Sequence, residues 1–427
     1  MKDKKKVILW FVAGFAAALV LTFLVLNLSL GEKKIERQLA RHYGSGDAQF
    51  QYEMGTLLGP PILDGNKTQT LVNGDQIFPS MLQAIAAARE TITFESYIYW
   101  SGDIGKAFAD ALAERARAGI KVNVLLDWAG SAKMEDSLLE QLKSSGVKFQ
   151  RFHEPKWYHL GRLNNRTHRK LLVVDGRVGF TGGVGIAPLW TGNAQDSEHW
   201  RDNHYRVEGP VVGQMQAVFL DNWIKASGEV LHGPTYFPRL QKVGDQSAHM
   251  FSSSPTGGAE SMQLMYLMAI TAADRTIDLA SAYFVPNEIT RSTMVKALKR
   301  GVKIRIIVPG PFTDADTVAN ASKATWGELL DAGAKIYEYQ PTMYHCKVMV
   351  VDGSISSVGS TNFDQRSFSL NDEANLNLYD QGFAREQTRI FEQDLARSRE
   401  YTAAEWHSRP LWDKAKERFA SLFSSQL

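Results

Sequence analysis

The longest apolar stretch of the chain lies at its N-terminus. Residues 7–30 carry no charged side chain, and four lysines precede them in residues 1–6. A helix rises about 1.5 Å per residue, so this stretch is long enough to cross a hydrocarbon core of about 30 Å. The apolar part of a cleaved signal peptide is shorter, about 7–15 residues, and residues 27–30 offer no small-residue cleavage pattern. We therefore expect a short basic tail over 1–6 and a retained transmembrane anchor over 7–30.

The charges that flank this predicted anchor leave its orientation open. Four basic residues precede it and four follow it within residues 31–41. The rule that the more basic end lies in the cytoplasm therefore does not decide the orientation of the anchor. The tight lysine cluster at the extreme N-terminus favours a cytoplasmic start. We expect a single-pass protein of the cell membrane whose large C-terminal part lies on the extracytoplasmic side.

Beyond a polar lead-in over residues 31–75, strand patterns alternate with helical patterns, and the order occurs twice. In the first half, a β-branched and aromatic run at 92–100 precedes a helical periodicity at 103–118. In the second half, a similar run at 276–284 precedes a helical periodicity at 288–301. The two copies lie roughly 180 residues apart, which is too long for a solenoid unit. The pattern predicts a duplicated domain.

Strands that alternate with helices also indicate the fold class. A helix between two strands implies a crossover connection, and such connections produce parallel sheets that are covered on both faces. We expect an α/β protein with two duplicated domains, over 76–240 and 241–427, whose mainly parallel sheets pack in pseudo-two-fold symmetry. The tail at 403–425 places aromatic and aliphatic side chains among Lys and Arg. It fits either an amphipathic contact with the membrane interface or packing against the domain.

Composition narrows the function only slightly. The 48 Lys and Arg residues are balanced by 46 Asp and Glu residues, and the formal net charge is +2. This balance gives no general electrostatic reason to expect a nucleic-acid partner. The single cysteine, Cys346, excludes an intramolecular disulfide and a cysteine-based zinc site. No obligate protein partner is inferred.

The two halves of the chain match most closely in a polar motif. The pattern H-x-K-x4-D occurs at matching points of the two halves, and each copy is followed by a glycine seven residues beyond its aspartate. These residues are His168, Lys170, Asp175 and Gly182 in the first half, and His345, Lys347, Asp352 and Gly359 in the second. One such pattern is only suggestive, but two at matching points of a duplicated domain are a strong signal.

The types and spacing of these residues fit phosphodiester chemistry. On a strand, His and Lys two positions apart point to the same face. A buried lysine without a partner would be costly in a packed core. Facing a phosphodiester, an imidazole can attack phosphorus or donate a proton, while an ammonium group neutralises the phosphate oxygens. We therefore expect the catalytic residues to be His168, Lys170, His345 and Lys347.

The two aspartates of the motifs stand near strand ends. Asp175 precedes Gly176, and Asp352 precedes Gly353, so both positions fit turns. We expect them to have a structural role, with direct catalysis as the alternative.

On these motifs the chain resembles the phospholipase D superfamily, over nearly all of residues 75–425. The resemblance implies that the two motifs meet across a pseudo-two-fold interface and form one site without a metal or other cofactor. It also implies that one histidine is the nucleophile that forms a phosphohistidine, and that the other is the general acid for the leaving alcohol. We expect His168 to be the nucleophile and His345 the acid, and the near-symmetry leaves the reverse assignment open.

Residues downstream of each motif refine the expected site. Ser360 and Asn362 match the G-S-x-N pattern of the family, and their hydroxyl and amide could donate to phosphate oxygens. The first half has Gly185 where the asparagine would stand, so one donor is missing unless backbone N–H groups of Gly182 and Gly183 compensate.

Two acidic residues lie at matching points farther along. Glu373 follows His345 by 28 residues, and its counterpart in the first half is Asp202. A carboxylate that accepts the second N–H of an imidazole fixes the tautomer and stabilises the imidazolium. We expect Glu373 and Asp202 to orient the histidines. Salt bridges at strand ends are the alternative.

Several stretches resemble the bacterial cardiolipin synthases in particular. They are residues 165–170, 200–202, 343–345, 362–367, 370–375 and 405–412. This resemblance implies transfer of a phosphatidyl group from one phosphatidylglycerol to the terminal hydroxyl of a second, with release of glycerol. The expected partners are phospholipid substrates and the membrane.

The motifs leave two rival functions open. A hydrolase of the same superfamily would use water as acceptor, on a phospholipid or, less in keeping with the charge balance, on a nucleic acid. A catalytically dead lipid-binding scaffold, which Gly185 could suggest, fits poorly with two complete His-Lys pairs.

Overall fold

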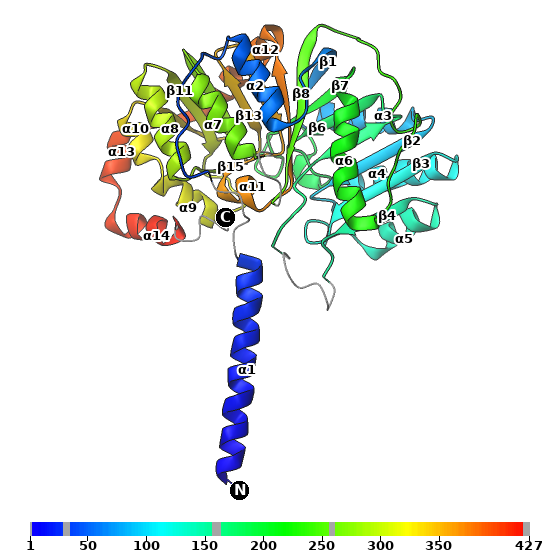
Figure 1. Ribbon diagram of the computed structural model, residues 1–427, viewed down its shortest axis with the longest axis horizontal. Coiled ribbons are helices and arrows are strands. Elements are labelled where there is room, and N and C mark those ends of the chain that lie inside the picture. The colour runs from blue at the N-terminus through cyan, green and yellow to red at the C-terminus, as the bar shows by residue number, and fades with distance from the viewer. Residues whose placement is uncertain (1, 29–34, 156–163, 256–260, 422–427) are drawn as a thin grey trace.

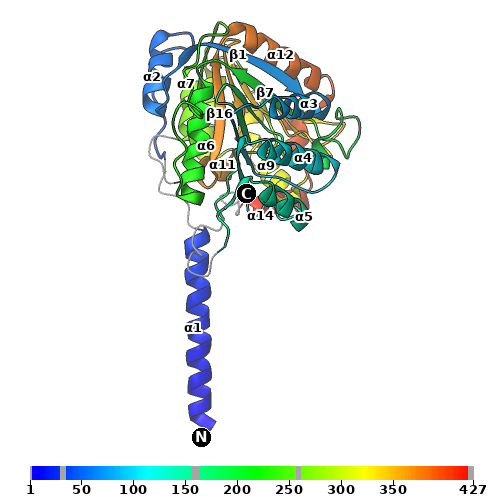
Figure 2. The same cartoon turned by 90° about the vertical axis from the view of Figure 1, so that its right-hand side faces the viewer.

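The computed structural model describes residues 2–28, 35–155, 164–255 and 261–421. Helix α1 (Lys2–Leu28) extends away from the folded body formed by the later elements (Figures 1 and 2). Its segment Lys4–Val25 has a mean hydropathy of 2.5, is not buried by the rest of the protein, and is long and apolar enough to cross a membrane. The last two residues of the predicted anchor, 29 and 30, lie outside the described part of the chain.

One sheet of fifteen strands runs through both halves of the described chain. At its centre, β1 (Leu63–Val72) pairs antiparallel with β8 (Gln246–Ser253). Outward from β1 the order is β7-β6-β5-β2-β3-β4, and outward from β8 it is β16-β14-β13-β9-β11-β12-β17. Corresponding strands therefore occupy corresponding places, with β17 as an addition, and the two repeats meet edge to edge around a pseudo-two-fold axis.

The bounds of the elements are as follows. The other strands of the first half are β2 (Thr91–Ser96), β3 (Lys121–Asp127), β4 (Lys148–Phe152), β5 (Leu171–Val174), β6 (Val178–Gly182) and β7 (Asn203–Glu208). Those of the second half are β9 (Thr276–Ser281), β11 (Lys303–Pro309), β12 (Lys335–Tyr339), β13 (Lys347–Val351), β14 (Ile355–Gly359), β16 (Glu373–Tyr379) and β17 (Ser398–Tyr401), and β10 (Phe284–Val285) and β15 (Phe363–Asp364) form a separate small sheet. The helices after α1 are α2 (Ala48–Leu58), α3 (Asn73–Ala86), α4 (Asp103–Arg117), α5 (Asp136–Ser144), α6 (Val212–Ser227), α7 (Met262–Ala272), α8 (Glu288–Lys299), α9 (Asp316–Ala324), α10 (Gly327–Asp331), α11 (Gln365–Ser369), α12 (Gln381–Leu395), α13 (Ala403–Ser408) and α14 (Leu411–Ser421).

The large sheet is mixed rather than mainly parallel, which corrects that part of the expectation. Within the large sheet of the described residues, strands pair in parallel only in the sets β2-β3-β4 and β9-β11-β12, where helices such as α4 and α8 supply the crossovers. The strands that follow the two motifs instead turn back at once, because Asp175 and Gly176 have φ of 52° and 60°, and Asp352 and Gly353 have φ of 53° and 66°. Two successive residues with positive φ form the tight turn of an antiparallel hairpin. The periodicity of an apolar strand does not reveal this.

The predicted lead-in at 31–75 also contains more structure than its polar composition suggested. It includes α2 and the central strand β1, in which the polar side chains of Asn66 and Thr68 are buried. The Asn66 side-chain amide, for example, donates to the carbonyl oxygens of Leu63 and Gln246. The boundary predicted at 240/241 falls in the segment between α6 and β8 and stays a prediction.

Both halves contribute to one shared hydrophobic core. Tyr205 and Trp223 of the first half pack in the same cluster as Met250, Leu376 and Phe391 of the second. Of two further cores, one lies under α3 and α4 in the first half, and the other lies around α7 and α8 in the second half and includes Phe50, Met54 and Leu58 of α2. The shared core holds the two repeats as one unit, so groups brought together at their junction keep a fixed geometry.

Candidate active site

The two motifs meet at the junction of the halves through matching backbone bridges. The N–H of His168 donates to the carbonyl of Asp372, at 2.9 Å, and the N–H of His345 donates to the carbonyl of Arg201, at 2.8 Å. In each case the accepting carbonyl belongs to the other half and directly precedes a carboxylate predicted for the site. The backbone register therefore brings each histidine to the acidic residue of the opposite repeat.

The side chains form two crossed histidine–carboxylate pairs. Nδ1 of His168 lies 2.9 and 3.0 Å from the two carboxylate oxygens of Glu373, and Nδ1 of His345 lies 2.7 Å from Oδ2 of Asp202. All four side chains are buried. A carboxylate that accepts the Nδ1 proton leaves Nε2 with its lone pair, the form that a nucleophile or a proton acceptor needs.

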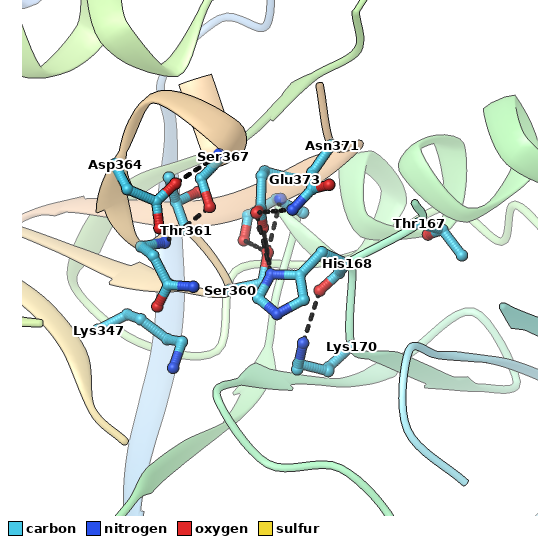
Figure 3. A network of polar contacts seen from close by, with 12 residues as sticks. Thr167, His168, Lys170, Lys347, Ser360, Thr361, Asp364, Ser367, Asn371 and Glu373 are labelled. Carbon is cyan, nitrogen blue, oxygen red and sulfur yellow. Dashed lines mark hydrogen bonds and ion pairs between the residues drawn. The ribbon is translucent and has the colours of Figure 1, made fainter. Parts of the chain in front are cut away.

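The two lysines present their ammonium groups beside the histidines. Nζ of Lys170 donates to the carbonyl of His168, at 2.8 Å, and Nζ of Lys347 donates to the carbonyl of His345, at 2.6 Å. Figure 3 shows both ammonium groups on the side of the His168 ring that faces away from Glu373. Both lysines are buried. Two cationic groups with remaining N–H donors suit an anionic group bound between the histidines.

Burial lowers the pKa of both imidazoles. The pKa of His168 falls to about 4, because lost hydration outweighs the attraction of Glu373 and the nearby Lys170 adds repulsion. The pKa of His345 is also lowered, first by burial and then by Lys347, whose Nζ lies 3.0 Å from Nδ1 of the ring. Both rings are therefore neutral in the resting site near pH 7.

The pKa values of the lysines and carboxyls beside the imidazoles are also shifted, and both carboxyls stay ionised. Burial lowers the pKa of Lys170 to about 7 and also lowers the pKa of Lys347. Burial alone would raise the pKa of Glu373 and Asp202, but the adjacent imidazole and lysine groups outweigh it and hold the pKa of both carboxyls below the usual value. An anionic ligand would favour the charged form of both lysines.

The support behind the two carboxylates differs between the halves. The hydroxyl of Ser360 donates to Glu373, whereas Nε1 of Trp190 donates to Oδ2 of Asp202, at 3.1 Å. Gly183 stands at the place of Ser360, and a Cβ there would lie 2.3 Å from the Asp202 carboxylate. The indole N–H therefore replaces the hydroxyl. Sequence reasoning missed Trp190, because it lies in a short turn outside both motifs.

A pocket of about 380 Å³ opens onto this centre. It is lined by both motif histidines, by aromatic side chains, and by Lys170, two arginines and two aspartates, so it combines apolar walls with charged groups of both signs. Ring centroids lie 5.2 Å apart for Tyr97 and His168, and 5.4 Å apart for Trp200 and His345. Such a lining suits a phosphodiester that carries apolar substituents.

The residues predicted to contact phosphate do not all line the pocket. Asn362 lines the pocket, but the hydroxyl of Ser360 is directed to Glu373. A Cβ on Gly182 or Gly183 would meet His204 or Asp202, so both glycines pack tightly behind the pocket. At the place of the missing asparagine, a Cβ on Gly185 would lie 2.7 Å from Ile98, which leaves no room for a side chain.

The two motif aspartates lie at the far ends of their strands, away from the histidines. The Asp175 carboxylate accepts backbone N–H groups of residues 89–91, and the Asp352 carboxylate accepts those of residues 274–276. Each therefore ties the hairpin turn to the start of the neighbouring strand, and neither is brought to the pocket.

The described residues contain no cluster of three or more His, Cys, Asp or Glu side chains that could hold a metal ion. The two histidines and the two carboxylates of the site bond in crossed pairs, and this arrangement can perform nucleophilic and acid–base chemistry.

Comparison with known proteins gives consistent results. Residues 81–220 and 266–395 match the family model described as "Cardiolipin synthase, PLD-like domain". The chain is 33% identical over 401 residues to a cardiolipin synthase of Alkalihalophilus pseudofirmus, covering 93% of this chain and 79% of that one. It is 34% identical over 360 residues to the probable cardiolipin synthase YwiE of Bacillus subtilis, covering 84% and 72%. The crystal structure of the phosphatidylserine synthase of Haemophilus influenzae shares the fold, with a TM-score of 0.66 at 14% identity, over 89% of this chain and 100% of that one.

Proposed function

The chain belongs to the cardiolipin synthase family of the phospholipase D superfamily, and on this basis we propose that it makes cardiolipin from two molecules of phosphatidylglycerol. It is an enzyme of phospholipid biosynthesis, and its substrates are phospholipids. In the proposed reaction one phosphatidylglycerol donates its phosphatidyl group, the terminal hydroxyl of a second accepts it, and glycerol is released.

The observation that carries this proposal is the crossed arrangement of the histidines. His168 is oriented by Glu373 and His345 by Asp202, so the two imidazoles belong to opposite halves yet serve one pocket. A double displacement at one phosphorus needs a nucleophile and an acid–base group of this kind. The two histidine–carboxylate pairs have nearly the same geometry, which fits a reaction in which one phosphodiester is exchanged for another.

In the first step, Nε2 of His168 attacks the phosphorus of the donor lipid. The phosphorus–nitrogen bond forms, the bond from phosphorus to the glycerol oxygen breaks, and the leaving oxygen takes a proton from His345. Lys170 and Lys347 neutralise the phosphate oxygens as charge builds up on them. Since His345 is neutral in the resting site, it must gain its proton as the anionic lipid binds.

In the second step, the hydroxyl of the acceptor lipid attacks the phosphohistidine. His345 removes the hydroxyl proton, the new phosphorus–oxygen bond forms, and the bond to His168 breaks. His168 is released unmodified, and no nucleotide is consumed. His345 again carries a proton, which it loses to solvent when the product leaves. Exchange of the two histidine roles gives the same overall reaction.

The apolar helix α1 is proposed to anchor the enzyme in the cell membrane. Both substrates are bilayer lipids, so an anchor confines the search to a surface and raises the effective concentration. The basic cluster before the helix favours an extracytoplasmic catalytic part.

Incubation of the detergent-solubilised full chain with phosphatidylglycerol alone tests the proposal. We expect cardiolipin and glycerol in equal amounts. Phosphatidic acid without cardiolipin would instead identify a hydrolase. A His168→Ala variant, purified in parallel, controls for contaminating lipid enzymes.

A further inference from the structure

Helix α14 (Leu411–Ser421) presents two different faces. Its buried face holds Ala420, which packs against Val318 and Ala321 of α9, and Glu417, which pairs with Arg409 at 2.8 Å. The exposed positions are Leu411, Trp412, Ala415, Lys416, Arg418 and Phe419. All of them are apolar or basic, and both acidic residues of the helix, Asp413 and Glu417, are at least partly covered.

The apolar exposure on this helix is large for a protein surface. Leu411 is 84% exposed and Trp412 is 71% exposed. Trp412, Ala415, Lys416 and Phe419 follow the spacing i, i+3, i+4, i+7, so they lie along one side of the helix. An aromatic and aliphatic stripe beside lysine and arginine is the pattern of a helix that lies in the headgroup layer of an anionic bilayer.

The position of α14 in the molecule agrees with such a contact. In Figure 1 it lies at the end of the folded body from which α1 extends and runs across the direction of α1, and in Figure 2 its label stands at the same end of the body. If α1 spans a bilayer, α14 therefore lies close to the plane of the membrane surface. By contrast, α2 lies at the opposite end of the body in both views.

Helix α14 is also connected to the pocket. Val318 of α9 belongs to the same cluster as Ala420 of α14 and also lines the active-site pocket, as do Asp314 and Ala315 just before α9. A bilayer in contact with α14 would thus lie next to the pocket wall formed by α9.

We propose that α14 is a second membrane-contact element, which inserts its exposed side into the interface of an anionic bilayer. Together, α1 and α14 make two contacts with the bilayer, so the body cannot rotate freely about α1. The pocket wall formed by α9 is then held at the membrane surface, where the lipid headgroups are. This inference concerns orientation and does not depend on the transfer chemistry.

A fluorescent probe on α14 tests the proposal in the full chain. The native cysteine, Cys346, is buried, so a cysteine introduced as Ala415→Cys can be labelled selectively with an environment-sensitive nitrobenzoxadiazole dye. The matched control is Tyr52→Cys on α2, where the native side chain is 66% exposed. Both proteins are reconstituted into phosphatidylglycerol vesicles and, separately, into phosphatidylcholine vesicles.

We expect the probe at position 415, but not at position 52, to shift to shorter wavelength and to be quenched by brominated lipid. The effect should be several-fold larger in phosphatidylglycerol, and Lys416→Glu combined with Arg418→Glu should reduce it. A probe at position 415 that responds like the one at position 52 overturns the proposal. The proposal is also overturned if a second copy of the chain covers position 415 and shields the probe in detergent without lipid. Because the readout requires no turnover, it succeeds or fails separately from the proposed reaction.

Discussion

Replacement of Glu373 by Gln removes a charge from the site while keeping nearly the same shape. Glu373 is fully buried, its carboxylate faces Nδ1 of His168 from 2.9 and 3.0 Å, and it also accepts from the hydroxyl of Ser360. An amide can still accept one hydrogen bond, so the fold should survive. The ionic contribution to the hydrogen bond with His168 is lost, and that contribution stabilises the imidazole as positive charge develops on it.

The size of the effect follows from this lost interaction. A hydrogen bond to a charged group contributes about 1.5–3 kcal/mol. Since about 1.4 kcal/mol corresponds to a tenfold change in rate, Glu373→Gln should lower turnover about 10- to 100-fold. Glu373 also raises the pKa of Lys170, which is about 7 in the intact site. Its removal should therefore move the alkaline limb of the pH profile to lower pH.

The assay is cardiolipin formation from phosphatidylglycerol in mixed micelles. It runs from about pH 4 to about pH 9, so that it covers the pKa values of His168 and Lys170. Glu338→Gln is the matched control. Glu338 lies on β12 outside the pocket and is also buried, but it pairs with Lys323 of α9 and Arg399 of β17. Circular dichroism verifies that both variants fold. A folded Glu373→Gln protein with the parent turnover and an unmoved alkaline limb would refute the orienting role.

Four further predictions follow from the same geometry. Turnover should survive excess EDTA, measured with detergent-dispersed lipid; loss restored by zinc or magnesium would contradict a mechanism based on side chains alone. The value of kcat/KM should fall below about pH 4, as His168 becomes protonated, and should fall as the pH rises through about 7, as Lys170 loses its proton and the proton that His345 must take up becomes scarcer; a flat profile across pH 7 would exclude a required Lys170 ammonium group in the free enzyme. His168→Ala should be inactive on every substrate, whereas His345→Ala should retain activity on a lipid with a p-nitrophenol leaving group, which departs without a proton; an acid-quenched phosphatidyl label on the His345 peptide would reverse the two roles. Trp190→Phe removes one donor to Asp202 and should lower turnover about 10-fold, the effect of about 1.5 kcal/mol for a hydrogen bond to a charged group, with little change in KM; unchanged turnover would assign Trp190 to packing only.

The local sequence contained most of the chemistry of this protein. The residues expected to carry the chemistry, His168, Lys170, His345 and Lys347, are visible because both motifs occur at matching points of a duplicated pattern. The apolar N-terminal helix is equally visible, since twenty or so consecutive apolar residues have few other uses. Properties of this kind depend on residue identity and short spacing, and neither requires knowledge of distant contacts.

The pairing of the site residues was decided by the tertiary structure. Glu373 follows His345 by 28 residues in the same half, yet it bonds to His168 of the other half, and Asp202 bonds to His345. The separation in sequence gives no hint of this crossing, because it arises where β1 and β8 join the repeats into one sheet and the backbone bridges set the register. The hairpins that make the sheet mixed, and the indole of Trp190 that replaces a serine hydroxyl, have the same origin. Each depends on which surfaces meet when two similar halves pack against each other, and the periodicity within either half contains no information about that contact.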